Sequence, residues 1–163
     1  MKNQETLYYI AKEYSDHGDF ENAKRIIHSM DDTKGQNQYR IWAYYYMKRR
    51  ISEQVIEVKG NSYKKQIDQN QKNAEKLIEQ SINNYNKVDK SAGKLSISKL
   101  DRFTGYTAYS VDCEKDKESE AKKVLKKITK QVKDSLVNIA KNIEIKIMID
   151  FKNGTAVLTI GAK

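Results

Sequence analysis

The segment LYYIAKEYSDHGDFENAKRIIHSM, residues 7–30, predicts two short helices that fold back on each other. Its apolar residues recur every three to four positions, as expected for one face of a helix. In the first half these residues are Leu7, Ile10, Ala11 and Tyr14, and in the second half they are Ala23, Ile27 and Met30. Gly18 is typical of a helix end, and Asp19 can cap a second helix that starts at Phe20. We therefore expect a helical hairpin, with helices over about residues 4–17 and from Phe20 towards Gly35.

This hairpin resembles a tetratricopeptide repeat over about one sixth of the chain. Its apolar residues and its Gly18-Asp19-Phe20 turn fall at the packing spacings of that family, and small alanines stand where the two helices approach. The hairpin departs from the family in having leucine at the first aromatic position and no closing proline. An unrelated hairpin that solves the same packing problem is the alternative. The resemblance implies a protein-binding role, with these partner-facing positions: Glu5, Tyr8, Lys12, Ser15 and Asp16.

The next helix, predicted over Asn37–Lys59, carries more aromatic rings than one helix can bury. Tyr39, Trp42, Tyr44, Tyr45 and Tyr46 lie on more than one side of it. Rings left on a surface are the usual anchors of protein interfaces, because they bury a large area at a small entropic cost. The alternative is that these rings pack on the helix that follows. The predicted partner-binding residues are Tyr8, Lys12, Trp42, Tyr45, Tyr46, Arg49 and Arg50.

The fourth predicted helix, Tyr63–Val88, has a narrow apolar stripe interrupted by Asn70. Such a stripe is typical of a connector or a coiled-coil partner rather than a central core helix, so a homodimer formed through it is left open. The turn-type cluster over residues 89–93 is the predicted domain boundary. It divides the chain into a helical module, residues 1–88, and a second module, residues 94–163.

The second module predicts strand, strand, helix, strand, strand. The alternating segments are Lys94–Leu100, Phe103–Cys113, Ile143–Phe151 and Ala156–Ile160, and Lys115–Asn142 is an amphipathic helix. Asn153-Gly154 is a strong hairpin signal. The predicted fold class is α+β, with the helical hairpin, the third and fourth helices, and a ββαββ module in which one helix packs on a four-stranded antiparallel sheet. Ile143–Phe151, the most apolar strand, is predicted to be central.

No motif in the chain demands catalysis. Both common nucleotide-binding loops are missing, and His17 and His28 belong to no metal or nucleophile motif. The single cysteine, Cys113, has no partner for an internal disulfide and is expected to be a small strand residue. We therefore expect no enzyme, no cofactor and no metal site. The least favoured alternative is a metal-dependent nuclease built from carboxylates at the strand ends, which are Asp101, Asp112, Glu114 and Asp150.

Charge favours a second function, nucleic-acid binding by the C-terminal module. Residues 1–60 hold 10 basic and 9 acidic residues, whereas the rest of the 163-residue chain holds 21 and 13, so most of the net charge of +9 lies there. Lysines on one helix face could contact phosphates, and tyrosines on an open sheet could stack on bases. The residues concerned are Lys122, Lys123, Lys126, Lys127, Lys130, Tyr106 and Tyr109.

The sequence also limits the setting of the protein. It has no apolar run of transmembrane length and no apolar core of a secretory signal, so we expect a cytoplasmic protein without a membrane partner. The excess of Lys, Asn, Ile and Tyr is typical of an AT-rich bacterial or phage genome. The favoured function is a non-enzymatic, protein-binding adaptor, regulator or inhibitor. Nucleic acid is the alternative partner.

Overall fold

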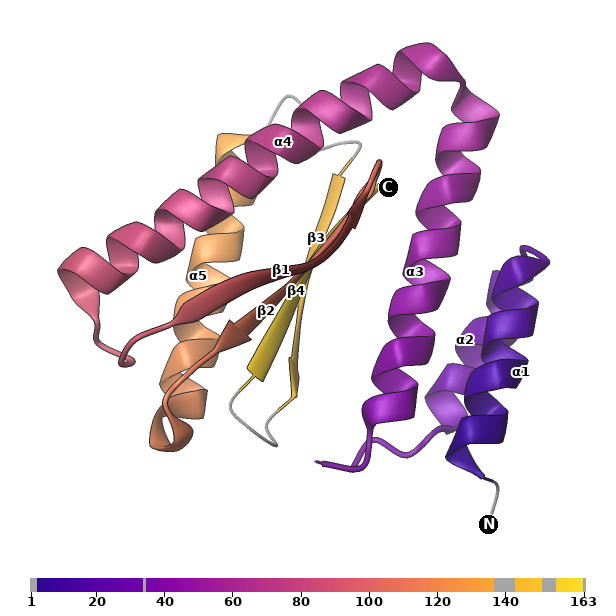
Figure 1. The fold of residues 1–163 in the computed structure, drawn as a ribbon, viewed down its shortest axis with the longest axis horizontal. Helices are drawn as coiled ribbons and strands as arrows, with labels where there is room; N and C mark the ends of the chain where they lie inside the picture. Colours follow the sequence, from indigo (N-terminus) through magenta and orange to yellow (C-terminus); the bar gives the residue numbers. More distant parts are fainter. Residues whose placement is uncertain (1–2, 34, 137–142, 151–154, 163) are drawn as a thin grey trace.

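The computed structural model describes residues 3–33, 35–136, 143–150 and 155–162, with side chains given outside residues 143–150 and 155–159 (Figure 1). Its helices are α1 (Gln4–Asp16), α2 (Phe20–Ser29), α3 (Gln38–Lys59), α4 (Asn61–Asn84) and α5 (Glu118–Ser135). Its strands are β1 (Ser96–Phe103), β2 (Tyr106–Asp112), β3 (Ile143–Asp150) and β4 (Thr155–Ala162). A π-helical turn, Tyr85–Asp89, ends α4, and a short 3-10 turn, Lys115–Lys117, precedes α5.

The first two helices form the predicted hairpin. Gly18 connects them with a positive φ of 74°, which a residue without a side chain adopts readily. Asp19 then caps α2, because its carboxylate accepts a hydrogen bond from the Asn22 backbone N–H at 3.3 Å. The buried residues between the helices are continuous with α3, in the cluster Leu7, Ala11, Ala23, Ile27, Met30, Ala43 and Met47. The hairpin therefore packs on α3, on the side away from the sheet (Figure 1).

The strands form an antiparallel sheet in the order β1-β2-β4-β3. The register pairs Phe103 with Tyr106 at the turn of the first hairpin, and Tyr106 in turn with Gly161 on β4. β1 carries an irregularity between Lys99 and Asp101. Because side chains alternate along a strand, Thr107, Tyr109 and Val111 share one face of β2, while Tyr106 and Ala108 share the other.

The helix α4 is part of the core, not the connector that its sequence suggested. Ala74, Ile78 and Ile82 are fully buried, and they join one cluster with residues of the sheet and of α5. Two polar residues of this helix, Gln71 and Glu75, are buried as well, and both have partners. The Gln71 side chain bonds the β1–β2 turn, and the Glu75 carboxylate lies 2.6 Å from the Arg102 guanidinium. Because these polar groups are paired, their burial does not carry the free-energy cost of a buried polar group without a partner.

The helical part and the sheet are in direct contact through small residues of α3. The Ser52 hydroxyl accepts a hydrogen bond from the Ala162 backbone N–H at 3.1 Å. Gly105 and Gly161 lie against the same turn of α3, because a Cβ added to either would meet Ser52 within 3.5 Å. This contact lies on the face of the sheet opposite α4 and α5. The division into modules at residues 89–93 stays a prediction, but the two parts touch.

The predicted architecture is wrong, although the broader α+β class holds. The chain is mostly helical, with five α-helices in its described part, and the sheet does not form a ββαββ module with one covering helix. Both α4 and α5 share its core on one face, and α3 packs against the other. The prediction of a central strand at Ile143–Phe151 is also wrong, because among the described strands β3 lies at an edge and pairs with β4 alone. The Asn153-Gly154 turn and residues 137–142 lie outside the described residues.

Candidate protein-binding site

A cluster of aromatic rings lies where α1 and α3 run side by side. The Tyr8 ring centre is 5.9 Å from that of Tyr39 and 6.4 Å from that of Trp42, and Tyr39 and Trp42 meet edge to face at 5.5 Å. Tyr9 extends the cluster, 5.2 Å from Tyr8. Trp42 and Tyr9 keep exposed fractions of 47% and 57%. The rings are thus fixed by one another but remain open to solvent on one side.

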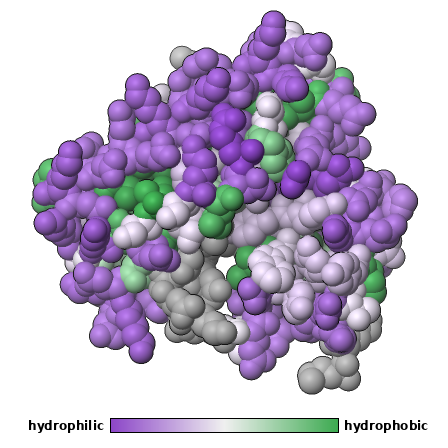
Figure 2. Space-filling view, viewed as in Figure 1, coloured by the Kyte–Doolittle hydropathy of each residue, from purple (hydrophilic) through white to green (hydrophobic). Residues whose placement is uncertain are grey.

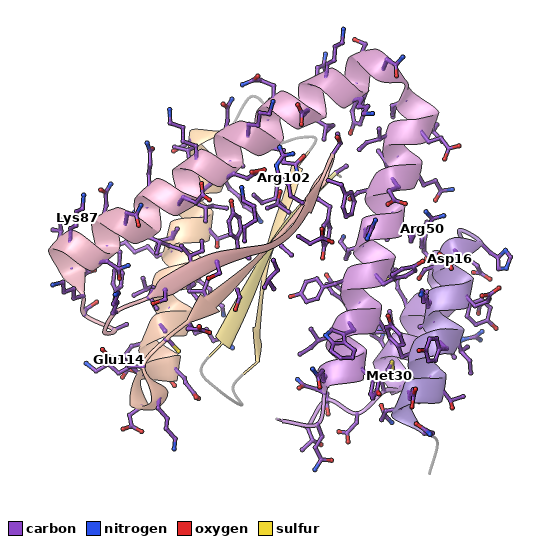
Figure 3. The ribbon with its side chains drawn as sticks, viewed as in Figure 1. Asp16, Met30, Arg50, Lys87, Arg102 and Glu114 are labelled. Carbon is purple, nitrogen blue, oxygen red and sulfur yellow. The ribbon has the colours of Figure 1, made fainter. Side chains whose placement is uncertain are left out.

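Charged residues continue the same surface towards the far ends of the two helices. The Lys12 ammonium lies 5.1 Å from the centre of the Tyr46 ring, whose hydroxyl donates to the Asp16 carboxylate. Asp16 and Arg50 lie next to each other (Figure 3), with Arg50 Nε 3.4 Å from the carboxylate. Arg50 also pairs with Glu53. Arg50 is therefore neutralised by two carboxylates of the chain, whereas Lys12 lies over a ring.

Between α1, α3 and the first hairpin of the sheet lies a shallow concavity of about 220 Å³. It is lined by Tyr8, Trp42, Tyr45, Tyr46, Arg49, Asp101 and Tyr106. Its floor is fixed by a stack in which the Arg49 guanidinium lies 4.1 Å from the centre of the Phe103 ring, and Phe103 stacks on Tyr106 at 4.9 Å. Arg49 is held further by Glu53 at 3.1 Å and by a longer contact with Asp101 at 3.9 Å.

Tyr45 forms part of the wall of this concavity rather than a protruding anchor. Its hydroxyl is buried and has no hydrogen-bond partner among the described residues. Burial, followed by the nearby Tyr106 and Tyr44, holds the pKa of Tyr45 far above its ordinary value. A partner cannot reach that hydroxyl without displacing the ring, so the predicted role of Tyr45 as a direct contact is limited to its ring.

The structure brings most of the predicted binding residues together. Five of the seven line the concavity, while Lys12 and Arg50 flank it along the same two helices. Of the positions implied by the repeat resemblance, Ser15 does not fit a partner-facing role, because it is 1% exposed and donates to the Ala11 carbonyl at 2.9 Å. In Figure 2 this side of the molecule is largely hydrophilic, with paler residues of intermediate hydropathy over the half of α3 that carries the rings.

Four residues of the site were not among the predicted partner-binding residues: Tyr9, Tyr39, Asp101 and Tyr106. Tyr39 was considered only as one of the many rings of the third helix, and Asp101 and Tyr106 only for the metal and nucleic-acid alternatives. Tyr9 could have been found, because it lies off the apolar stripe of the first helix and next to another tyrosine. Asp101 and Tyr106 could not, because only the packing of α3 against the β1–β2 hairpin brings them to the concavity. No residue spacing in the sequence predicts that contact.

Of the predicted nucleic-acid-binding residues, the lysines are exposed and the tyrosines are buried. The five lysines lie exposed on α5. Tyr109 is 1% exposed and Tyr106 5% exposed, so neither ring presents a face on which a base could stack. The prediction that these tyrosines stack on bases is therefore wrong. The sheet is not open at these residues, because α4 covers one face and α3 covers the other.

The carboxylates proposed for a metal site do not gather. Asp101 and Asp112 lie towards opposite ends of the first hairpin, and the side chain of Asp150 lies outside the described residues. Among the residues that the structure describes, no group of three or more His, Cys, Asp or Glu could hold a metal ion. Cys113 is half-buried, and burial raises the pKa of its thiol. None of the described helices is both long and apolar enough to cross a membrane.

Comparison of the chain with protein-family models, with curated proteins and with solved structures finds no match. The site is therefore interpreted from its own geometry. An open ring cluster beside a shallow concavity, with internally paired charges, is an arrangement suited to contact with another macromolecule.

Proposed function

We propose that this chain is a non-enzymatic protein-binding adaptor, regulator or inhibitor. It binds through the α1–α3 surface, defined here as Tyr8, Tyr9, Lys12, Tyr39, Trp42, Tyr46 and Arg49. The observation that carries the proposal is the exposure of Trp42, which keeps 47% of its surface open although its ring is in contact with the rings of Tyr8 and Tyr39. A ring that is held in place but left open can bury area on binding without a large loss of conformational freedom.

The composition of this surface agrees with that of a binding hot spot. Trp, Tyr and Arg are the residue types that dominate the energy of protein interfaces, and the surface combines all three. Val58 and Val88 are exposed as well, but neither is among the residues packed against the two hydrophobic clusters. Single exposed apolar residues are ordinary, whereas a contiguous group marks an interaction site.

The test is selection of peptides from a random phage-displayed library on the purified full chain. Clones that bind the wild type should lose binding to Trp42→Ala and keep binding to Val88→Ala, because Val88 is 87% exposed and lies on another part of the molecule. Thermal melts of both variants keep folding and binding apart. Failure to enrich any clone, or equal binding to Trp42→Ala, would overturn the proposal.

A second candidate function, nucleic-acid binding, is supported by a lysine stripe on α5. Lys123, Lys126, Lys127, Lys130 and Lys133 follow one another at helical spacing, and all are exposed. The first and last of them are ten positions apart, which is about 15 Å along the helix axis. A row of positive charges can contact a phosphate backbone but does not distinguish one base sequence from another.

Binding of a single-stranded oligonucleotide should weaken steeply with added salt, and the double substitution Lys126→Glu and Lys130→Glu should abolish it. A gel at low salt that shows no shift would eliminate this candidate.

A further inference from the structure

Three hydrogen-bond donors on the α1–α3 surface are available to the acceptors of a partner. The hydroxyls of Tyr8 and Tyr39 and the indole N–H of Trp42 make no hydrogen bond to the described part of the chain. A segment in the polyproline II conformation has no internal hydrogen bonds, so all its backbone carbonyls are available as acceptors. Grooves that bind such segments are lined by aromatic rings, on which the proline rings pack. The surface offers both features.

The length of the ring row also fits that conformation. Tyr39 and Tyr46 are seven residues apart on α3, which corresponds to about 10.5 Å along the helix axis. Three residues of a polyproline II helix advance about 9.3 Å. The rings at the two ends of the row, with Trp42 between them, are therefore spaced to meet equivalent positions on successive turns of such a segment.

The charges at the site favour an uncharged occupant. Arg49 and Arg50 are both paired with Glu53, and Arg50 also with Asp16. A cationic segment would meet these arginines and Lys12, whereas an anionic segment would meet Asp16, Glu53 and Asp101. Proline residues carry no charge and bring little conformational entropy to lose, because the segment is already extended before it binds.

We propose that the α1–α3 surface binds a proline-rich segment of a partner protein in the polyproline II conformation. The proposal rests on the protein-binding function above and names the chemistry of the partner. The chain contains no proline. A second copy of these 163 residues therefore cannot supply the occupant.

Trp42 is the only tryptophan of the chain, so its fluorescence reports on this surface alone. The full-length protein is titrated with a synthetic oligoproline of about nine residues, or three turns, and in parallel with an alanine-rich peptide of equal length. We expect a saturable change of emission with oligoproline only. Tyr39→Ala should weaken binding roughly tenfold, and Tyr39→Phe, which keeps the ring and removes only the hydroxyl, about threefold. Val88→Ala should leave it unchanged.

The two proposals fail separately. If library peptides without proline bind at Trp42 while oligoproline causes no saturable change, the proline-rich partner is wrong and the protein-binding function stands. If an oligolysine peptide binds more tightly than oligoproline, the rings accept a cation, and the proposal is overturned in favour of that chemistry. If no peptide binds in either experiment, both proposals fail. Binding of oligoproline that Tyr39→Phe and Tyr39→Ala leave unchanged would also contradict this site.

Discussion

The side-chain oxygen of Gln71 on α4 accepts a hydrogen bond from the backbone N–H of Gly105, 2.7 Å away in the turn between β1 and β2. Its nitrogen lies within hydrogen-bond distance of the Thr107 hydroxyl at 2.7 Å and of the backbone carbonyls of Phe103 and Tyr106 at 2.9 and 3.0 Å. One side chain, 1% exposed, thus satisfies the polar groups of a buried turn. The same turn supplies the Phe103 and Tyr106 rings beneath the concavity.

Replacing Gln71 with alanine should therefore be costly. It leaves several buried backbone groups without partners, and each unsatisfied group costs about 1–3 kcal/mol. We expect Gln71→Ala to lower the free energy of unfolding by about 3 kcal/mol, measured by urea denaturation. Gln69→Ala is the control, since Gln69 is exposed on the same helix and should change stability by less than about 0.5 kcal/mol. Equal effects of the two substitutions would show that the turn does not depend on Gln71.

A pair of glycines can separate backbone strain from packing between α3 and the sheet. Gly105 and Gly60 have similar positive φ values, 87° and 90°, so alanine at either should cost about 1–2 kcal/mol for that conformation. A Cβ at Gly60 would meet nothing within 4 Å, whereas at Gly105 it would lie 2.6 Å from Ile56 Cδ1. Gly105→Ala should therefore be the more destabilising by about 1 kcal/mol.

Shortening the neighbour tests the origin of that difference. Ile56→Val removes the Cδ1 atom, so the double variant should recover part of the extra loss, as measured in a double-mutant cycle by thermal unfolding. Simple addition of the two single effects would mean that α3 and the turn do not press on each other in this way.

Local patterns predicted the helices better than their partners. The Gly18-Asp19 turn and the apolar spacing around Ala11 and Ala23 located α1 and the start of α2, because those signals are formed by residues close in the sequence. The end of α2 was predicted too late, since the helix stops at Ser29 and does not continue towards Gly35. The isoleucines of residues 143–149 predicted a strand but not its neighbours. Alternation specifies the two faces of a strand, and it carries no information about which strand lies beside it. For this reason the apolar pattern of β3 could not show that it lies at the edge of the sheet.

The candidate site was predicted in part for the same reason. An excess of rings on α3 is visible in the sequence, because one helix has too little buried surface for Tyr39, Trp42 and Tyr45 together. The polar residues of α4, in contrast, look like a break in its stripe until Gln71 and Glu75 are seen to bond the sheet. The contribution of Asp101 and Tyr106 depends on the same long-range packing, which sequence spacing does not encode.

The buried hydroxyl of Tyr45 predicts an unusual substitution. Since it has no hydrogen-bond partner among the described residues, Tyr45→Phe removes a desolvated polar group and no bond. We expect the variant to be as stable as the wild type or more stable by up to about 1 kcal/mol, as measured by thermal unfolding. It should also keep its affinity for any peptide selected on the α1–α3 surface. A loss of more than about 1 kcal/mol would reveal a partner for that hydroxyl.

Tyr46→Phe should behave in the opposite way, and its effect should depend on pH. Its hydroxyl donates to the Asp16 carboxylate, and burial followed by this hydrogen bond raises the pKa of Tyr46 from 10.0 to about 12. A pKa that is higher in the folded state means that the neutral hydroxyl is favoured there. The contribution of the Tyr46 hydroxyl to stability is complete below pH 10 and is lost as the pH rises towards about 12.

The wild type should therefore melt at a higher temperature than Tyr46→Phe at neutral pH, and this difference in melting temperature should close between pH 10 and about 12. Other effects of high pH are common to both proteins and cancel in the difference. A gap that stayed constant to the upper end of that range would show that the Tyr46–Asp16 hydrogen bond contributes nothing to stability.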